Sequence, residues 1–240
     1  MTPEWIAGAV VIAVASFVLG LTGFGIGLVA MALLPYLMSP VTAIVLLTIY
    51  TTALVLVILV PVWRHVEPWP VADMLGGTLL GTPLGVWALS TFPVSTLNRL
   101  IGATLVVVVL LEWARIRPRH LAGRGWGLGA GILAGVVGGA VGTPGPPVIL
   151  YATTQGWSPR TIKANLQAFF FFNQAVILAG YWWAGLVTTQ VWRLAASFAL
   201  PAAGGALLGM LCFHHVDPQR FRRLVFGLLL ASGLLLLGRG

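Results

Sequence analysis

An uncharged apolar run extends from Trp5 to Met38 and is broken near its middle by glycines, in the stretch Gly20-Leu-Thr-Gly-Phe-Gly-Ile-Gly. A membrane helix needs about 20 apolar residues to cross a hydrocarbon core of about 30 Å. The run is longer than one such span, yet the part that follows the last of these glycines, Gly27–Met38, could form only about 18 Å of helix. It is therefore predicted to lie in a membrane and to be interrupted at its glycines.

A second copy of this interrupted segment occurs downstream, as Gly135-Val-Val-Gly-Gly-Ala-Val-Gly-Thr-Pro-Gly-Pro-Pro. Three glycine pairs match at a constant separation of 115 residues: Gly20, Gly23 and Gly27 with Gly135, Gly138 and Gly142. Further matches pair Ser39-Pro40 with Ser158-Pro159, and Gly81 and Gly85 with Gly205 and Gly209. These matches predict an internal duplication, with a first repeat at residues 1–116 and a second at 117–240.

The composition supports a membrane protein. Hydrophobic residues make up 59% of the chain and charged residues only 8%, whereas a soluble domain carries about 25% charged residues. No alternation of apolar and polar residues indicates barrel strands. The net charge of +8 does not indicate a nucleic-acid partner, because the basic residues lie in short loops between apolar runs, where they set topology. We therefore expect an all-α integral membrane protein.

Beyond the two interrupted runs, six further spans are predicted at about 41–62, 73–92, 93–113, 161–180, 191–213 and 218–237. Asp73 and Ser95 are expected to cap the helices that begin beside them. Asp217-Pro218 is typical of an N-cap followed by proline in the first helical position. Each half thus contains one interrupted run and three ordinary spans.

Two topologies follow, depending on whether an interrupted run crosses the membrane or returns to the side from which it came. If both runs cross, seven basic residues lie on the cytoplasmic side and six outside. If both are re-entrant hairpins, ten are cytoplasmic and three, Arg99, Arg193 and Arg239, are outside. The positive-inside rule favours the second topology. It predicts two inverted repeats, each a re-entrant helical hairpin plus three transmembrane helices, with the N- and C-termini outside.

A hairpin tip inside a membrane needs polar surroundings, because an unpaired backbone group in lipid costs several kcal/mol. A helix that restarts after the tip presents its first N–H groups and its positive dipole end, which suit an anion. Glycines that only permit close helix packing are the alternative interpretation. The predicted substrate-binding residues at the two tips are Thr22, Gly23, Phe24, Gly25, Gly27, Gly138, Gly139, Gly142, Thr143, Pro144, Gly145 and Pro146.

Amide side chains in the span after the second tip are further candidates. Gln167, Asn173 and Gln174 fall within about 120° of one helical face. Amides are expensive in lipid and face either a cavity or a partner helix. Substrate binding and hydrogen bonding between helices are both compatible with this pattern.

The positions of the ionisable residues argue against an enzyme. The five acidic residues, Glu4, Glu67, Asp73, Glu112 and Asp217, all fall at predicted helix ends or in loops. No carboxylate–histidine cluster indicates a metal site, and no catalytic residue or cofactor is predicted. A membrane enzyme acting on lipid phosphates would need a Glu, Asp or His at the tips for acid–base chemistry. That enzyme and a structural membrane subunit are the alternatives to a transporter.

The repeated glycine motif, the Gly145-Pro146-Pro147 restart and the two similar halves resemble the sulfite exporter TauE/SafE family. The resemblance covers essentially the whole chain. It implies transport of a small anion, such as sulfite or a sulfur-containing organic acid, across the bacterial inner membrane. Members usually carry a proline soon after the first glycine motif, whereas this chain has Ala32 and then Pro35.

The sequence therefore predicts a secondary transporter, in the exporting direction, for sulfite or a sulfonated or carboxylated organic acid. The anion is predicted to bind where the two tips meet near the midplane. Transport would be driven by the membrane potential or coupled through the protonation of the substrate itself. The expected partners are the small anion and the lipid bilayer, and a homodimer is left open.

Overall fold

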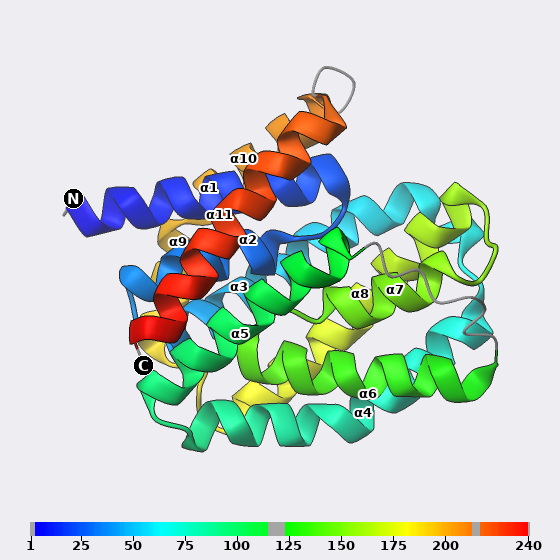
Figure 1. Cartoon of the computed structure of the whole chain (residues 1–240), viewed down its shortest axis with the longest axis horizontal. Coiled ribbons are helices and arrows are strands. Elements are labelled where there is room, and N and C mark those ends of the chain that lie inside the picture. Colours follow the sequence, from blue (N-terminus) through cyan, green and yellow to red (C-terminus); the bar gives the residue numbers. More distant parts are fainter. Residues whose placement is uncertain (1–2, 115–122, 213–216, 240) are drawn as a thin grey trace. The chain divides into compact units, whose positions relative to one another are not determined.

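The computed structural model describes residues 3–114, 123–212 and 217–239. Within these ranges every regular element is a helix (Figure 1), which confirms the predicted all-α class. The elements are α1 (Pro3–Thr22), α2 (Ile26–Leu33), η1 (Leu34–Tyr36), α3 (Pro40–Leu59), η2 (Val60–His65), α4 (Pro68–Thr91), α5 (Val94–Trp113), α6 (Arg124–Val141), α7 (Gly145–Thr153), α8 (Pro159–Trp183), α9 (Thr189–Ser197), α10 (Ala199–Cys212) and α11 (Pro218–Arg239). Arg115, Arg117 and Arg119 of the basic loop, and the predicted repeat boundary, lie outside the described residues.

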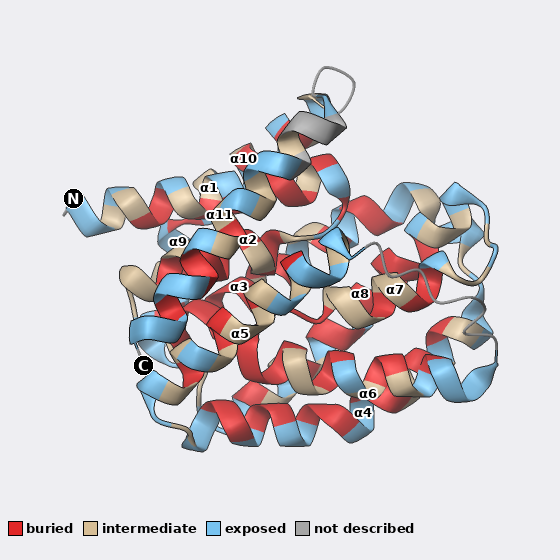
Figure 2. Cartoon of the chain, viewed as in Figure 1, coloured by how far each residue is buried: buried red, intermediate tan, exposed pale blue. Residues whose placement is uncertain are grey.

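Several of the described helices have the length and composition of membrane spans. Four of them, or five if the bent pair α9–α10 is one span, are long and apolar enough to cross a bilayer. Large apolar side chains such as Leu80, Leu133 and Leu208 are exposed on α4, α6 and α10, and Figure 2 shows exposed faces along these helices. Exposed apolar faces of this kind suit lipid rather than water.

Two predicted N-caps and one predicted continuous span were wrong, and proline accounts for each. Helix α4 begins at Pro68, so Asp73 lies inside it rather than at its cap, since proline is tolerated in a first helical turn. Helix α5 begins at Val94 with the extended Pro93, not Ser95, as its N-cap. The predicted span 191–213 is two helices bent by 49°, and Pro201 lies just after the bend, where its missing N–H weakens a continuous helix.

Contacts divide the chain into two compact units that do not follow its two halves. Unit 1 comprises Met1–Leu47, Phe92–Arg115 and Thr188–Gly240, and unit 2 comprises Thr48–Thr91 and Ile116–Val187. Each unit therefore combines segments from both predicted repeats. The division of the sequence into repeats at 1–116 and 117–240 stays a prediction.

In unit 1, α1 and α10 touch through their backbones. A Cβ on Gly205 would overlap the carbonyl oxygen of Ala13, and one on Gly209 would overlap that of Phe17. The contact is reciprocal, because a Cβ on Gly20 would overlap the carbonyl oxygen of Ala206. Small residues permit such close approach of membrane helices, and positions rise together along both helices, so the two run parallel.

Unit 2 contains the corresponding pair, α4 and α6, which lie side by side in Figure 1. A Cβ on Gly77 would overlap the carbonyl oxygen of Leu128, and one on Gly81 would overlap that of Ile132. In return, Gly131 meets the carbonyl of Met74. These helices also run parallel.

The two helix pairs use equivalent contacts. Ala13 and Leu128, like Phe17 and Ile132, differ by the 115 residues that separate the glycine motifs. The glycines that make equivalent contacts are Gly77 and Gly205, and then Gly81 and Gly209. The sequence alignment had paired Gly81 with Gly205, so the alignment of α4 with α10 must move by four residues, which is one helical turn. Glycines recur every four residues along α4, so sequence alone could not choose between these registers.

Both interrupted runs are broken helices. The first break lies between α1 and α2, where Gly23 and Gly25 have φ of 82° and 88°. The second lies between α6 and α7, where Gly142 has φ of 74°. Gly142 at the second break is therefore equivalent to Gly23 at the first break, whereas the sequence alignment paired it with Gly27. Helix α6 therefore continues one turn further than α1 beyond the shared glycine contact before it breaks.

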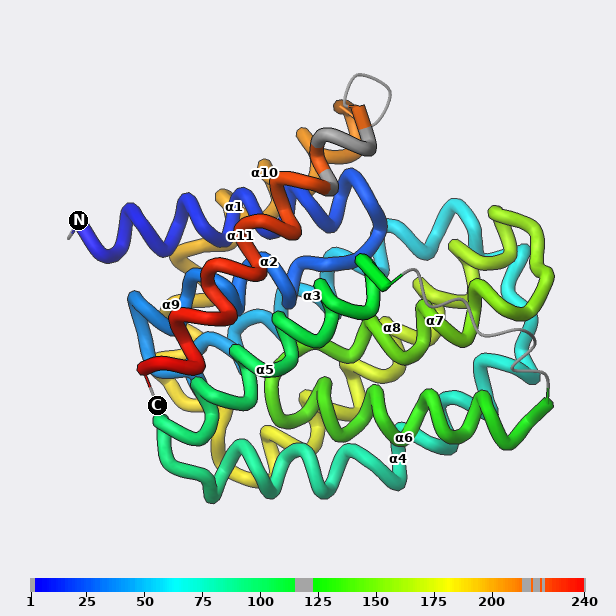
Figure 3. Tube along the Cα trace, in the orientation of Figure 1, coloured from blue at the N-terminus to red at the C-terminus, as the bar shows by residue number. Residues whose placement is uncertain are grey.

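In each interrupted run, a residue that follows the break lies close to the first part of the helix that precedes the break. Tyr151, near the end of α7, lies against Gly127 in the first turn of α6, with its hydroxyl oxygen 3.2 Å from a Cβ placed there. Met38, which follows α2, approaches Gly8 near the start of α1, with a corresponding distance of 3.9 Å to its Cε. The Cα trace in Figure 3 can be followed through the second reversal from α6 into α7.

The backbone contact predicts a sharp difference between two glycines of the same helix. Gly131→Ala would drive a methyl group into the carbonyl of Met74, and overpacking of this kind costs about 1–3 kcal/mol. Gly129→Ala meets nothing within 4 Å and should be neutral or slightly stabilising, since alanine favours helix. Thermal unfolding in detergent should show a lower Tm for Gly131→Ala only. Equal Tm values for the two variants would contradict the packing.

Candidate anion site at the helix breaks

The second break is a buried turn that ends α6 and begins α7. Gly142 takes the left-handed conformation, and its N–H donates to the carbonyl of Gly138 over 2.9 Å. Glycine adopts this conformation without the strain that a Cβ brings. Pro144 follows as the N-cap of α7, whose first residue is Gly145.

Prolines limit the donors that this break can offer. Pro144, Pro146 and Pro147 have no N–H, so Gly145 carries the one backbone N–H between Thr143 and Val148. The sequence prediction of several converging N–H groups at this tip therefore needs revision. The positive end of the α7 dipole remains, and any further donor must come from a side chain.

Thr143 supplies that side chain. Its exposed fraction is 3%, and its Oγ1 has no hydrogen-bond partner. Leaving a buried hydroxyl unsatisfied costs about 1–3 kcal/mol. Among the described residues, Ser16, Thr82, Asn98 and Asn165 also have a buried polar atom without a partner, but each of them lies within a helix. Thr143 lies at a helix break.

One face of α8 lies against this break. The ring of Phe170 is 3.8 Å from a Cβ placed on Gly145, and Ile177 is 2.9 Å from one placed on Gly138. Gln174 lies between these two residues on the same helical face, and Gln167 lies one turn before Phe170. Both glutamines are buried. The face of α8 that carries Gln167 and Gln174 therefore lies along the second break.

Asn173 points to a different neighbour. The Thr78 hydroxyl on α4 donates to Asn173 Oδ1 over 3.0 Å, and Asn173 Nδ2 donates to Gln174 Oε1 over 3.3 Å. Asn173 thus joins α8 to α4 in hydrogen bonds between helices, one of the two interpretations left open by its sequence. Asn165, in the same helix, accepts from the N–H of Glu67 over 2.8 Å and holds the start of α4.

Tyr181 was not predicted as a site residue, although it contacts the end of α6. Its side chain is fully buried, and its hydroxyl donates to the carbonyl of Gly139 over 2.8 Å, with Gly138 O at 3.3 Å. A buried tyrosine needs a partner for its hydroxyl. The signal was available in the sequence, since Tyr181 falls on the same α8 face as Gln174.

The first break has a different arrangement. The Thr22 hydroxyl donates to the carbonyl of Val18 over 2.8 Å and also lies 2.7 Å from the carbonyl of Phe24. Thr22 and Phe24 are exposed. The first helical bond of α2 comes from Val29 to Gly25 O, so the N–H groups of residues 26–28 precede the intrahelical ladder.

The structure assigns the predicted site residues to the two units. Unit 1 holds Thr22, Gly23, Phe24, Gly25 and Gly27, and unit 2 holds Gly138, Gly139, Gly142, Thr143, Pro144, Gly145, Pro146, Gln167, Asn173 and Gln174. Within unit 2, the contacts with α8 bring the glycines of the break close to the face that carries Gln174.

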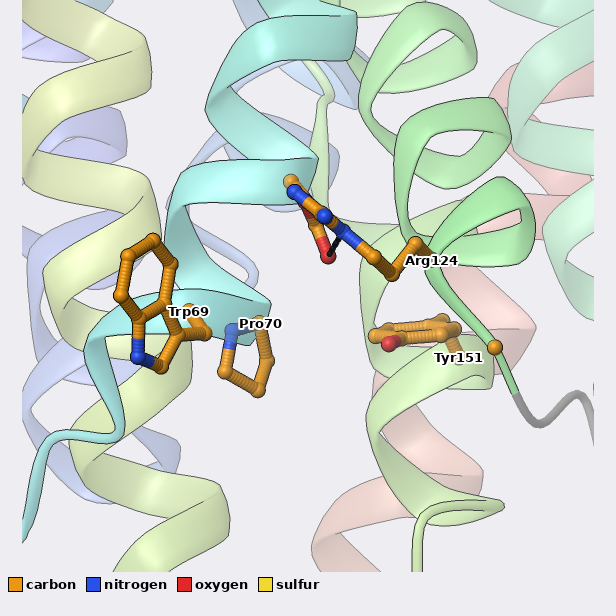
Figure 4. Close-up of a pocket in the computed structure, with 6 residues that line it drawn as sticks. Trp69, Pro70, Arg124 and Tyr151 are labelled. Atoms are coloured by element: carbon orange, nitrogen blue, oxygen red, sulfur yellow. Dashed lines mark hydrogen bonds and ion pairs between the residues drawn. The ribbon is translucent and has the colours of Figure 1, made fainter.

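A pocket of about 450 Å³ lies at the other end of α6, where α4 and α6 begin and α7 ends. Its lining residues are Trp69, Pro70, Asp73, Gly123, Arg124 and Tyr151. In Figure 4 the Arg124 side chain extends above the Tyr151 ring, and Trp69 and Pro70 lie on the opposite side. Arg124 Nη2 is 3.0 Å from Asp73 Oδ1. This ion pair, in which Arg124 is exposed and Asp73 is partly buried, joins α4 to α6 and neutralises the charge of Arg124. Among the described residues, the pocket therefore has no unpaired cationic group for an anion.

Comparison with known proteins identifies the family of the chain. Residues 8–236 match the family described as Sulfite exporter TauE/SafE. No curated protein and no solved structure matches the chain. The match includes both helix breaks and all the described helices except the first five residues of α1 and the last three of α11. The chain therefore belongs to the sulfite exporter TauE/SafE family, as its glycine motifs predicted, and is a multi-pass membrane transporter of small anions rather than an enzyme.

Proposed function

We propose that this protein is a secondary transporter that exports sulfite or a small sulfonated or carboxylated organic acid, and that the anion binds at the second helix break. The observation that carries the proposal is the buried Thr143 hydroxyl, which has no partner in the protein. An anion at the start of α7 would accept hydrogen bonds from this hydroxyl and from the Gly145 N–H. It would also lie at the positive end of the helix dipole.

The surroundings suit a small anion. Phe170 and Ile177 border the break from α8, and apolar walls strengthen hydrogen bonds to charge by excluding water. No acidic residue lies in the sequence of α6, α7 or α8, so no carboxylate repels an anion there. Hydroxyl and N–H donors satisfy an oxyanion without the desolvation penalty of a buried arginine.

The absence of acidic residues from these three helices also bears on coupling. Proton relays in transporters use acidic or histidine side chains within spans, and α6, α7 and α8 contain neither type. Transport coupled through protonation of the substrate, or driven by the membrane potential, needs no such residue. We favour these two driving forces.

Directions within unit 2 support a re-entrant hairpin at α6–α7. Helix α8 runs parallel to α4, since Asn165 bonds Glu67 and Asn173 bonds Thr78 further along. Helix α6 also runs parallel to α4. Because α6 and α8 begin at the same end of unit 2, the segment between them must return to that end. A run that crossed the membrane would place α8 antiparallel to α6.

Charge orients this unit in the bilayer. Arg64, Arg124, Arg160 and Lys163 all lie near the N-terminal ends of α4, α6 and α8. The positive-inside rule then places this end in the cytoplasm of a bacterial inner membrane. With an equivalent hairpin at α1–α2, the chain would consist of two inverted repeats with both termini outside.

Labelling of single cysteines tests the hairpin. In a Cys212→Ser background, Gly125→Cys in the first turn of α6 and Thr153→Cys at the end of α7 are both exposed positions. We expect an impermeant maleimide to reach both from the cytoplasmic side of oriented membrane vesicles. Labelling of the two positions from opposite sides would show that α6–α7 crosses the membrane.

Removing the Thr143 hydroxyl tests the anion site. A hydrogen bond to a charged group contributes about 1.5–3 kcal/mol, so Thr143→Val should raise the KM for sulfite in proteoliposomes by about tenfold to a hundredfold. Thr143→Ser retains the hydroxyl and should stay near the wild-type KM. Thr104→Val is a matched control, because its hydroxyl bonds only the carbonyl of Leu100 within α5. An unchanged KM in Thr143→Val would place the anion elsewhere.

A further inference from the structure

We infer that the pocket at the start of α4 and α6 binds the zwitterionic headgroup of a phospholipid with a primary ammonium, phosphatidylethanolamine. This pocket lies at the other end of α6 from the second break, so the inference is independent of where the transported anion binds. Its volume of about 450 Å³ falls within the range of about 300–1,000 Å³ that is typical of small-molecule sites. All of its lining residues belong to unit 2.

The two charged residues that line the pocket favour a ligand with charges of both signs. Arg124 Nε and Nη2 donate to the Asp73 carboxylate over 3.0 to 3.2 Å, so the pair has no net charge. A ligand with a single charge would be attracted by one partner and repelled by the other, whereas a zwitterion presents a charge to each. The two N–H groups of Arg124 Nη1 make no hydrogen bond with the described residues and can donate to a phosphate.

Tyr151 supplies an acceptor for the ammonium. Its exposed fraction is 4%, yet its hydroxyl makes no hydrogen bond with the described residues. In Figure 4 the hydroxyl is directed toward Pro70 across the pocket. The ring makes an edge contact with Trp157, with centroids 6.1 Å apart, which holds it in this direction. A buried tyrosine hydroxyl usually has a partner, so this one indicates a ligand.

Gly127 allows the two acceptors to lie close together. A Cβ on Gly127 would be 3.2 Å from the Tyr151 hydroxyl oxygen and 3.4 Å from Asp73 Cβ, so both side chains border the same glycine. A hydroxyl oxygen and a carboxylate both accept from the N–H groups of a primary ammonium. The quaternary ammonium of choline has no N–H, so the pocket should distinguish ethanolamine from choline.

Exposed apolar residues continue from the pocket along both helices, which favours a lipid over a soluble zwitterion. Leu128, one turn after Arg124 on the same face of α6, is exposed and lies 3.6 Å from a Cβ placed on Gly76 of α4. Leu80, one turn after Gly76, is also exposed. Acyl chains attached to a headgroup in the pocket would cover these side chains. Trp69, at the rim, is exposed and is of a residue type enriched at membrane interfaces.

A comparison of lipids tests the headgroup. Delipidated protein in detergent would be titrated with dioleoyl lipids and followed by native mass spectrometry. The apparent Kd should be about tenfold lower for phosphatidylethanolamine than for phosphatidylcholine or phosphatidylglycerol, because hydrogen bonds to charged groups are at stake. Glycerophosphoethanolamine, the same headgroup without acyl chains, should bind at least about a hundredfold more weakly than the lipid.

Two results of this comparison would overturn the inference. Equal Kd values for the three lipids would show that the pocket does not recognise the headgroup. A Kd for glycerophosphoethanolamine as low as that for the lipid would assign the pocket to a soluble zwitterion.

Tyr151→Phe tests the ammonium acceptor, because it keeps the ring and removes the hydroxyl. It should raise the Kd for phosphatidylethanolamine by about tenfold and leave that for phosphatidylcholine unchanged, a difference that a loss of packing alone would not produce. Tyr36→Phe is the matched control. Tyr36 is the residue 115 positions earlier, and its hydroxyl donates to Ser232 O over 3.4 Å. A Tyr151→Phe protein that still prefers phosphatidylethanolamine as strongly as the wild type would overturn the role of the hydroxyl.

Asp73→Asn tests the charge matching and serves if Tyr151→Phe is not recovered in membranes. An ion pair with an exposed partner contributes little to stability, so the variant should fold. It leaves Arg124 without its carboxylate and should therefore abolish the preference for phosphatidylethanolamine and lower the Kd for the anionic phosphatidylglycerol by about tenfold. Unchanged Kd values for both lipids would contradict the proposed site.

Discussion

Direct contact between helix backbones is the constraint on which the rest of this structure depends. In each unit, one helix of a broken pair lies so close to a parallel helix that a single methyl group would overlap a carbonyl oxygen. Lipid offers no hydrophobic driving force for association of apolar helices, so close packing of this kind must supply it. The glycines on α4 and α6, and on α1 and α10, therefore fix where each break lies relative to its neighbours.

The breaks then pose a second physical problem, because a helix that ends inside a membrane leaves polar backbone groups without water. The chain solves it in two ways. At the first break, Thr22 bonds its own preceding turn. At the second, Tyr181 satisfies the helix end from α8, and Thr143 keeps its donor. Two breaks that look alike in sequence thus differ in the chemistry they can offer a ligand.

Much of the fold and part of the site could be predicted from residues alone. The glycine interruptions placed both breaks, and the low charge identified a helical membrane protein. The proline pattern of residues 144–147 could also have shown that the second tip has few N–H donors, because proline lacks this group in any conformation. Predictions that needed a choice of register were weaker. Asp73 was expected to cap a helix and instead pairs with Arg124, and the repeat alignment moved by one turn.

The sequence by itself determined that the chain is a member of the TauE/SafE family, that it is helical and membrane-embedded, and that its helices break at Gly23–Gly25 and Gly142, because composition and backbone freedom are properties of the residues themselves. Tertiary structure decided which polar groups are free. Asn173 and Thr143 are both buried polar residues near the second break, yet Asn173 is bound to Thr78 while Thr143 Oγ1 has no partner. Which donor is left for a ligand depends on the partners that packing brings within hydrogen-bond distance, and a one-turn difference in helix register changes those partners.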